Sequence, residues 1–231
     1  MKRLLSLLLA LALLLPAAAL ASEQFGYTDA ADARRQALEA FRVCAFSAEY
    51  HNSGRDSIVR WEEPIRVFAA GKPGTTDLRR LDEFLTQLSL RVPGLPVISR
   101  VDAQSQANVV IHYCRLSEMP SLIPSYVSGN WGYFSFQSSG SRIISSTIGI
   151  AYDVCDQQAR NHLMMEELTG CLGLANDHNL YRDSILYQPW TTIQSLSEVD
   201  WIMLNYLYSP LVSPGDTWNT VERAIRERYG L

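Results

Sequence analysis

Asn161-His-Leu-Met-Met-Glu-Glu-Leu-Thr-Gly-Cys-Leu-Gly-Leu-Ala-Asn-Asp-His178 is the stretch from which the fold of this chain is best inferred. Its hydrophobic pattern predicts a helix over residues 157–172 that Gly173 ends, because glycine readily adopts the left-handed backbone that closes a helix. His162 and Glu166 are four residues apart, so both side chains project from one face of that helix. The stretch therefore combines a helix with polar groups of the kind that carry chemistry.

The end of the stretch, Leu172-Gly-Leu-Ala-Asn-Asp177, resembles the active-site helix and turn of metzincin metalloproteases. Those enzymes read H-E-x-x-H-x-x-G-x-x-H, often followed by Asp, and hold zinc through the three histidines. Alignment on Gly173 as the turn glycine assigns the first histidine, the catalytic glutamate, the second histidine and the third histidine, in that order, to Glu166, Glu167, Gly170 and Asn176. The E-E-L-T-x-x-L-G-L-x-N-D pattern also resembles a bacterial family of exported proteins known only as a domain of unknown function.

A second segment stands where metzincins have their Met-turn, commonly S-I-M-x-Y. It reads Ser184-Ile185-Leu186-Tyr187, with Leu186 in place of the methionine, and we interpret it as a structural turn. The segment that follows, Leu196-Ser-Glu-Val-Asp200, looks like the one after a matrixin Met-turn and carries an S-x-x-D helix start. The resemblance covers roughly residues 57–210 and implies a zincin-like fold.

Hydrophobic periodicity in the rest of the chain predicts an α+β layout. Helices are expected over 29–46, from a Thr76 cap to Pro93, from Ser197 to Tyr208 and over 214–229, and strands over 65–69, 97–101, 107–114, 133–136 and 143–154. With the resemblance, this predicts a zincin-like (metzincin-like) mixed sheet with an active-site-type helix and a C-terminal helical part. The expected organisation is a signal peptide at 1–21, an N-terminal helical segment at 22–56 and a zincin-like domain at 57–231.

The residues at the ligand positions depart from the metzincin pattern. Zinc catalysis needs three protein ligands, an open position for water and a base. Gly170 has no side chain to offer and Asn176 is a poor zinc ligand, so we expect no metal and no zinc-peptidase activity. The alternative is a displaced site for zinc or calcium built from Glu166, Asn176, His162 and His178.

Glu166 and Glu167 admit two further interpretations. As neighbouring carboxylates they can form an acid/base pair, with Glu167 as the general base of a hydrolase and Glu166 as its partner. Adjacent helical residues diverge by about 100°, however, which favours partly buried acids that hydrogen-bond the loop over 176–184. In that case Arg160 or Arg182 is the candidate to neutralise Glu166.

Residues 118–141 are rich in Pro, Ser, Gly and aromatic residues. Aromatic side chains supply binding energy in grooves, although such a cluster can equally form a small core. The residues expected to line a ligand cleft are Tyr133, Phe136, Gly170, Gly173, Asn176 and Asp177, with Trp131 and Phe134 near them. In zincins the substrate adds as a strand to the sheet edge, so the expected partners are an extended peptide, an envelope protein or a cell-wall component. A purely structural subunit of an envelope complex is the remaining alternative.

The N-terminal residues indicate the compartment. Met1-Lys-Arg3, a Leu/Ala run over 4–15 and Ala19-Leu-Ala21 predict a Sec-type signal peptide cleaved after Ala21, hence a periplasmic or secreted protein. Removing Lys2 and Arg3 from the 20 basic residues leaves 18 against 24 acidic ones, a net charge of −6. This balance disfavours nucleic acid as a partner, and no later stretch is apolar enough to span a membrane.

Four cysteines remain after processing: Cys44, Cys114, Cys155 and Cys171. An even number in an exported chain favours two disulfides, for which three pairings exist. Cys155–Cys171 is the least expected pairing, because one helix between them separates the two ends by about 24 Å. The expected pairings are Cys114–Cys155 and Cys44–Cys171.

Overall fold

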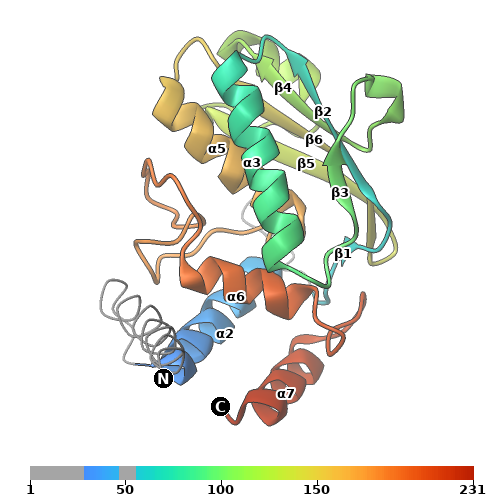
Figure 1. Cartoon of the computed structure of the whole chain (residues 1–231), viewed down its shortest axis with the longest axis vertical. Helices are drawn as coiled ribbons and strands as arrows, with labels where there is room; N and C mark the ends of the chain where they lie inside the picture. Colours follow the sequence, from blue (N-terminus) through green and yellow to red (C-terminus); the bar gives the residue numbers. More distant parts are fainter. Residues whose placement is uncertain (1–28, 47–55) are drawn as a thin grey trace, which may run out of the picture.

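The computed structural model describes residues 29–46 and 56–231, so the predicted signal peptide lies outside the described residues. In chain order the elements are α2 (Ala30–Phe46), β1 (Arg60–Trp61), β2 (Ile65–Gly71), α3 (Thr75–Arg91), β3 (Ile98–Arg100), β4 (Val109–Cys114), α4 (Met119–Leu122), β5 (Gly132–Ser139), β6 (Arg142–Ala151), α5 (Gln157–Cys171), α6 (Glu198–Leu207) and α7 (Trp218–Tyr229). Figure 1 shows α3 and α5 crossing one face of the sheet, while α2, α6 and α7 gather at its lower end.

The fold is a mixed α/β arrangement. Among the described residues, five strands run parallel in the order β1-β6-β4-β2-β3, and β5 pairs antiparallel with β6. The predicted mixed sheet with helices is therefore confirmed, but the expected α+β class is wrong. Parallel neighbours require crossover connections, and α3 and α5 lie on the sheet as helices of an α/β fold do.

The centre of the core lies between the sheet and these two helices. Val67 of β2 lies opposite Val109 of β4, and Ile111 of β4 lies opposite Ile148 of β6. All four side chains are fully buried, in the same cluster as Leu85 of α3 and Leu163 of α5. Strands buried in this way carry near-continuous apolar runs, which is why 107–114 was predictable as a strand.

β5 is an edge strand within the described part of the chain, because its one strand partner there is β6. The predicted strand over 133–136 is confirmed and is longer, running from Gly132 to Ser139. Gly140, with a φ of +58°, turns the chain back into β6, and a bulge lies between Gln137 and Ser138. The edge is thus held in place over the N-terminal half of β5 and bends in its C-terminal half.

Two predicted helix starts were wrong. α3 begins after Gly74 rather than Thr76, because the buried Asp77 carboxylate accepts a hydrogen bond from the Gly74 N–H at 2.7 Å. α7 begins at Trp218 rather than Pro214. Residues 213–216 form a turn instead, in which the Asp216 carboxylate accepts from the Ser213 N–H and the Asp216 carbonyl accepts from the N–H of Ile58. In both cases a nearby aspartate side chain decides where the helix begins.

Gly173 ends α5 as predicted, and two constraints make glycine necessary there. Its φ is +124°, a conformation that residues with a side chain rarely adopt. A Cβ at this position would also lie 2.5 Å from the carbonyl oxygen of Val59. The glycine therefore both reverses the chain after α5 and lets the segment before β1 approach it.

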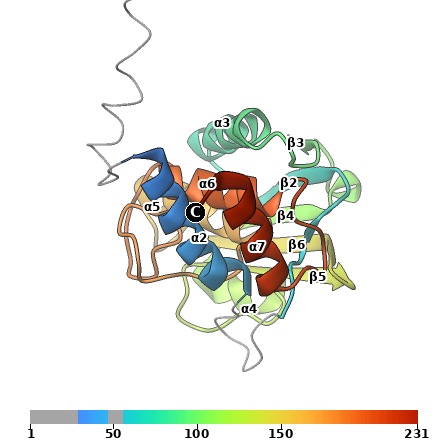
Figure 2. The ribbon, with the colours of Figure 1, turned by 90° about the horizontal axis from the view of Figure 1, so that it is seen from below.

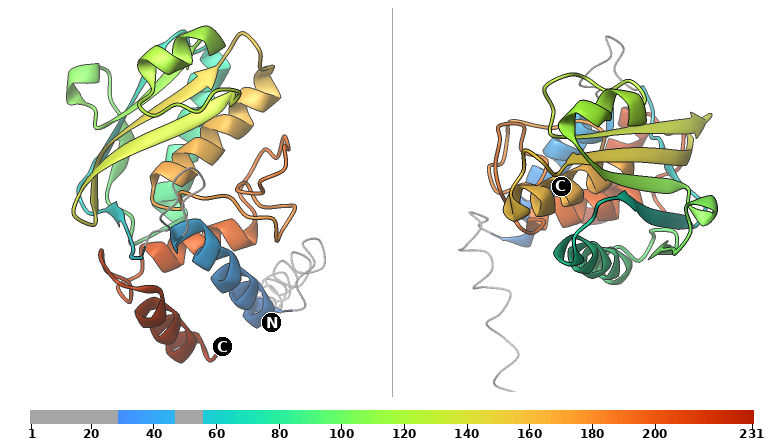
Figure 3. Two further views of the ribbon diagram at one scale, coloured as in Figure 1. Left: turned by 180° about the vertical axis from the view of Figure 1, so that it is seen from behind. Right: turned by 90° about the horizontal axis from the view of Figure 1, so that it is seen from above.

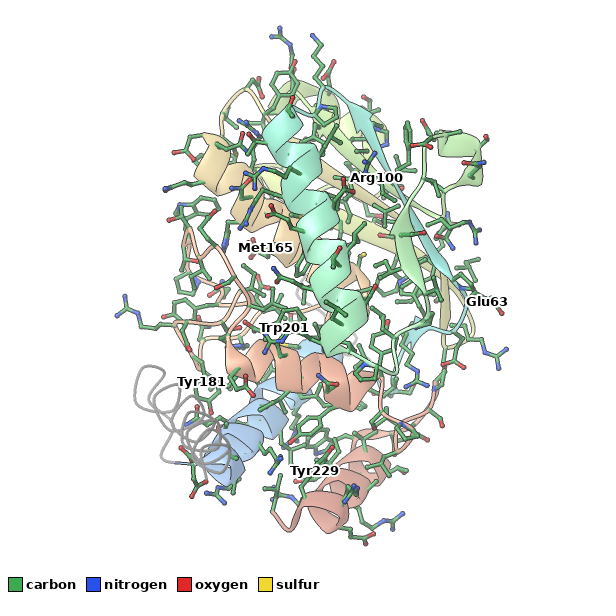
Figure 4. All side chains as sticks on the ribbon, viewed as in Figure 1. Glu63, Arg100, Met165, Tyr181, Trp201 and Tyr229 are labelled. Carbon is green, nitrogen blue, oxygen red and sulfur yellow. The ribbon has the colours of Figure 1, made fainter. Side chains whose placement is uncertain are left out.

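The lower helical layer is tied to the sheet half by several side chains. α2, α6 and α7 lie together when the molecule is seen from below (Figure 2). Trp201 of α6, labelled in Figure 4, faces the lower end of α3, and its ring centroid is 6.5 Å from that of Phe84 of α3. The hydroxyl of Tyr181 donates to Glu39 of α2 at 2.9 Å, which links α2 to the long loop after α5. Residues of α2 and of the sheet belong to one core cluster.

The predicted disulfides do not form. Cys44, Cys114, Cys155 and Cys171 are all buried free thiols. Cys114 belongs to a small cluster with Met119 and Ile123, whereas the other three belong to the main core, so each thiol is packed as a small apolar group. Burial raises the pKa of Cys114 and of Cys155 to about 11. Among the residues described, every helix is too short or too polar to span a bilayer.

Candidate functional site

A cavity lies between the edge strand, α5 and the loop that follows α5. It has a volume of about 640 Å³. Figure 3 (left) shows β5, α5 and this loop from behind. The described residues that line it are Ser125, 129–136, Leu163, Glu166, Glu167, Gly170, Leu174, Ala175, Asp177, Leu186, Gln188 and Trp190. We call this cavity the cleft.

The position of the expected second zinc ligand is filled by a ring. A Cβ on Gly170 would lie 2.5 Å from Cε1 of Phe134, so the phenyl ring of β5 rests directly on the backbone of α5. Phe134 also stacks with Phe136, with ring centroids 6.2 Å apart. A residue with a side chain at position 170 would displace this ring. The donor set and the space at this position do not fit a zinc ion.

One turn earlier on α5, Glu167 meets the same strand. Its side chain is 8% exposed and lines the cleft, and a Cβ on Gly132 would lie 2.5 Å from its Oε1 atom. Both glycines therefore allow β5 and α5 to approach closely. Gly132 leaves room for the carboxylate of Glu167, and Gly170 leaves room for the ring of Phe134. This pairing of small and large residues was not visible in the sequence, because Gly132 and Glu167 are 35 residues apart and Phe134 and Gly170 are 36 residues apart.

Glu166 lies beside His162 as the helical spacing predicts. The Oε2 atom of Glu166 is 3.4 Å from Nε2 of His162, and Nδ1 of His162 is 2.9 Å from the carbonyl oxygen of Ile193. A carbonyl oxygen can only accept, so Nδ1 carries the proton and donates it. Burial lowers the pKa of His162, although the bond to Ile193 acts in the opposite direction. The hydrogen bond of His162 thus links α5 to Ile193 in the loop that follows this helix.

Arg160, one of the two arginines considered as a partner of Glu166, forms an ion pair with an aspartate of α3. Its Nε atom is 3.1 Å from Oδ1 of the buried Asp77, and it also donates to the carbonyl of Cys155. Gln157 donates to the same Asp77 oxygen at 2.7 Å. Arg160 therefore joins the N-terminal turns of α3 and α5, and the neutralisation of Glu166 by Arg160 or Arg182 stays a prediction.

His178 belongs to a buried hydrogen-bond chain behind the cleft wall. Its Nδ1 atom accepts from the Leu180 N–H at 3.1 Å, so its Nε2 atom carries the proton and donates to Oγ of Ser184 at 3.1 Å. Ser184 in turn donates to Oδ1 of Asp200. All three polar side chains are at most 2% exposed. The order His–Ser–Asp, with serine in the middle, is that of a structural link and not of a catalytic triad.

Asp200 connects this chain to the start of α6. Its Oδ2 atom accepts from the Ile185 N–H at 2.9 Å and from the Ser197 N–H at 2.8 Å, and the predicted Ser197 capping box is present. Burial raises the pKa of Asp200 to about 6, while the hydrogen bonds from Ser184, Ile185 and Ser197 act in the opposite direction. The segment 184–187 is therefore fixed to α6 as a structural turn, and Leu186 of that segment lines the cleft.

Of the four alternative metal ligands, His162 and Glu166 lie side by side, whereas Asn176 and His178 form hydrogen bonds with other residues. The side-chain amide of Asn176 donates to the carbonyl of Asp177, and its backbone N–H donates to that of Cys44. His162 and His178 are bonded as described above. Within residues 29–46 and 56–231, no group of three or more His, Cys, Asp or Glu side chains has an arrangement that could hold a metal ion.

The predicted cleft residues divide into two groups. Gly170, Asp177, Tyr133 and Phe136 line the cleft, whereas Gly173 and Asn176 lie outside its lining. The ring of Tyr133 packs edge-on against Tyr126, with centroids 5.6 Å apart, in the smaller cluster. The sequence analysis did not predict Gln188 and Trp190, because both lie in a loop whose local pattern has no signal for a cleft.

The fold and the site together define a mixed α/β domain with a cleft between the edge of its sheet and a buried helix. A family model described as "Protein of unknown function (DUF2927)" matches residues 34–227, so the chain belongs to that family. This agrees with the predicted similarity to a domain of unknown function. A search of curated proteins found no match.

Proposed function

We propose that the protein is an exported, metzincin-like domain without zinc-peptidase activity that binds an extended peptide segment in its cleft. The single observation that supports this most strongly is the contact between Phe134 and Gly170. The ring occupies the place of a ligand side chain, while a cavity of about 640 Å³ remains beside it. A domain in which a packed ring stands in place of a zinc-ligating side chain, and which has kept its cleft, is suited to binding.

The arrangement of elements supports the metzincin-like part of the proposal. An antiparallel edge strand, β5, runs beside the helix α5, and Gly173 turns the chain directly after that helix. The segment 184–187 then contributes Leu186 to the lining of the cleft, at the place in the chain where a Met-turn would stand. The N-terminal 21 residues, which read as a signal peptide, support export to the periplasm or the medium.

The hydrogen-bond pattern of β5 supports strand addition. The carbonyl of Trp131 accepts from the Ala151 N–H, and Tyr133 lies opposite Gly149 in the ladder. In an antiparallel pair, alternate residues direct both backbone groups to the partner strand. Gly132 and Phe134 therefore direct theirs away from β6, and both residues line the cleft. An extended peptide would bind there by main-chain hydrogen bonds.

The test is a binding screen of the mature protein against a library of extended seven-residue peptides, read by fluorescence anisotropy. Each binder is then N-methylated at one position at a time. Strand addition predicts that affinity is lost at alternate positions, because alternate N–H groups face β5. Ala175→Trp, which fills the cleft, should abolish binding, whereas Leu90→Trp, at a site 76% exposed and outside the cleft lining, should not. Absence of any binder, or equal losses at every methylated position, would contradict strand addition.

A hydrolase that uses Glu167 as a general base is the second candidate, favoured by the burial of that carboxylate at the cleft wall. Metal analysis of untagged protein and peptidase assays distinguish the two. One zinc or calcium per chain, lost with a chelator and in Glu166→Ala, together with activity lost in Glu167→Gln, would establish the hydrolase. Metal-free protein without peptidase activity is the result expected for the binding domain.

A further inference from the structure

Two large, exposed aromatic side chains belong to the lining of the cleft. Trp131, just before β5, is 41% exposed, and Trp190, in the loop after α5, is 54% exposed. Their ring centroids are 5.5 Å apart and their planes are inclined by 74°, so the two indoles form the walls of a corner between the strand and the loop. We call it the indole corner. A pair of exposed indoles at a cavity marks a place where a partner group can bind.

One wall of the indole corner is held in position by a buried histidine. The ring of Trp190 packs edge to face against that of His162, with centroids 5.5 Å apart. His162 is 2% exposed, and its Nδ1 atom donates to the carbonyl oxygen of Ile193 at 2.9 Å. The loop therefore meets the same imidazole at two places, once through a ring and once through a carbonyl. A ring that is positioned before a ligand arrives lowers the entropic cost of binding.

Two neutral amide side chains lie beside the indoles. Asn130 directly precedes Trp131, Gln188 is two residues before Trp190, and both amides belong to residues that line the cleft. The Nδ2 atom of Asn130 donates to the carbonyl of Val127 at 3.1 Å, whereas its Oδ1 atom accepts no hydrogen bond from the described residues. The side-chain amide of Gln188 makes none with that part of the chain either. Both amides thus have hydrogen-bonding capacity to offer a ligand.

The combination of indoles and amides selects the kind of group that fits. A purely apolar group on the indoles would take the neighbouring amides out of water without replacing their hydrogen bonds, which is unfavourable. A pyranose ring has both kinds of surface. Its C–H groups pack against the negative face of an indole, and the hydroxyls around its rim donate and accept hydrogen bonds. A sugar ring that lies on one wall of the corner therefore directs its rim toward the other wall and the amides.

We propose that the indole corner, together with Asn130 and Gln188, is a subsite for a pyranose ring of a glycan chain. A ring of the glucose type fits best, because its hydroxyls are all equatorial and both of its faces are formed by C–H groups. This binding goes beyond the peptide binding proposed above and does not require it. Strand addition uses the backbone of Gly132 and Phe134, whereas the sugar uses side chains.

The probes are two β-1,4-linked tetrasaccharides, one of glucose and one of N-acetylglucosamine, which share this ring shape. Binding to the mature protein is measured by isothermal titration calorimetry and by the change in tryptophan fluorescence. At least one of the two should bind saturably, with a Kd of about 1 mM or lower.

Variants assign the binding to the corner. Trp131→Ala and Trp190→Ala should each weaken it by about tenfold or more, because a wall against which the sugar packs is lost. Gln188→Leu should weaken it by about 2- to 12-fold, the range for one hydrogen bond. Trp190→Phe keeps an aromatic ring against His162 and should bind with an affinity between those of the wild type and Trp190→Ala, which separates lost stacking from lost folding. Leu180→Ala, at an exposed site of the same loop outside the cleft lining, should change nothing.

Four outcomes are informative. Saturable sugar binding that is weakened in the alanine variants of both tryptophans and kept in Leu180→Ala supports the inference. Absence of binding by both tetrasaccharides overturns the glycan subsite and leaves the peptide-binding function standing, since that function is tested with peptides alone. Sugar binding of unchanged affinity in the tryptophan variants also overturns it. A peptide from the library that loses affinity in both tryptophan variants, while neither sugar binds, would show that the corner holds a peptide side chain instead.

Discussion

At the scale of single residues, the site is decided by two glycines of α5 and β5. Gly170 accommodates the ring of Phe134, and Gly132 accommodates the carboxylate of Glu167. The sequence showed that Gly170 could not be a metal ligand. It did not show that the vacated space would be filled by an aromatic residue 36 positions earlier, since side-chain packing across a sheet edge has no local signature.

Because Phe134 contacts Gly170, we expect the effect of Gly170→Ala on the free energy of unfolding to have opposite signs in the wild-type protein and in a Phe134→Ala variant. Alone, Gly170→Ala should lower the free energy of unfolding by about 1–2 kcal/mol, because the clash with the ring outweighs the gain in helix propensity. In a Phe134→Ala background the clash is absent, so the same substitution should raise it by about 0.5–1 kcal/mol. Urea unfolding of the four proteins of this cycle measures the coupling. Equal effects in both backgrounds would show that the ring does not rest on Gly170.

At the scale of elements, the loop after α5 is held by a buried polar chain. His178, Ser184 and Asp200 link it to the first turn of α6, and Leu186 is positioned in the cleft wall as a result. The sequence predicted the helix start at Ser197 and the turn at 184–187 as separate motifs. Only the fold showed that Asp200 serves both.

This chain of hydrogen bonds makes stability depend on pH through His178. Burial lowers its pKa to about 4, below an ordinary value near 6.5. The contribution of His178 to the free energy of unfolding is therefore full above about pH 6.5 and is lost as the pH falls toward 4. Asp200 acts in the opposite sense, since a pKa raised to about 6 gives a contribution that is lost as the pH rises through 6.

His178→Asn separates the two effects, because Asp200 is present in both proteins. The variant loses the titrating group, so its stability deficit should be smaller at pH 4.5 than at pH 7, by about 2 kcal/mol. Urea unfolding of both proteins at the two pH values provides the measurement. A deficit that stays constant with pH would mean that His178 titrates normally in the folded protein.

At the scale of the whole molecule, one core joins the sheet, its two covering helices and the lower helical layer. All four cysteines are packed in the interior as free thiols. Burial raises the pKa of Cys171 to about 12, so it does not ionise near neutral pH. The expectation of two disulfides came from the compartment and the even count, which say nothing about where the folded chain places each sulfur atom.

The packing of the cysteines predicts the reactivity of the folded protein. The native protein should react with less than one equivalent of a thiol-specific chromogenic reagent at pH 7.5, because the thiols are buried and protonated. In denaturant without reductant, all four thiols should react. Detection of no thiols in denaturant would establish two disulfides and contradict the structure at these positions.

The sequence by itself determined the elements whose signals are local. The periodicity over 29–46, the glycine at 173 and the Ser197 capping box each act within a few residues, and each appears in the structure as predicted. The tertiary structure alone decided which side chains meet: Phe134 with Gly170, Trp131 with Trp190, and His178 with Asp200 through Ser184. Propensity and capping are energies of adjacent residues, whereas packing depends on the path of the whole chain, and the cleft is made of contacts of the second kind.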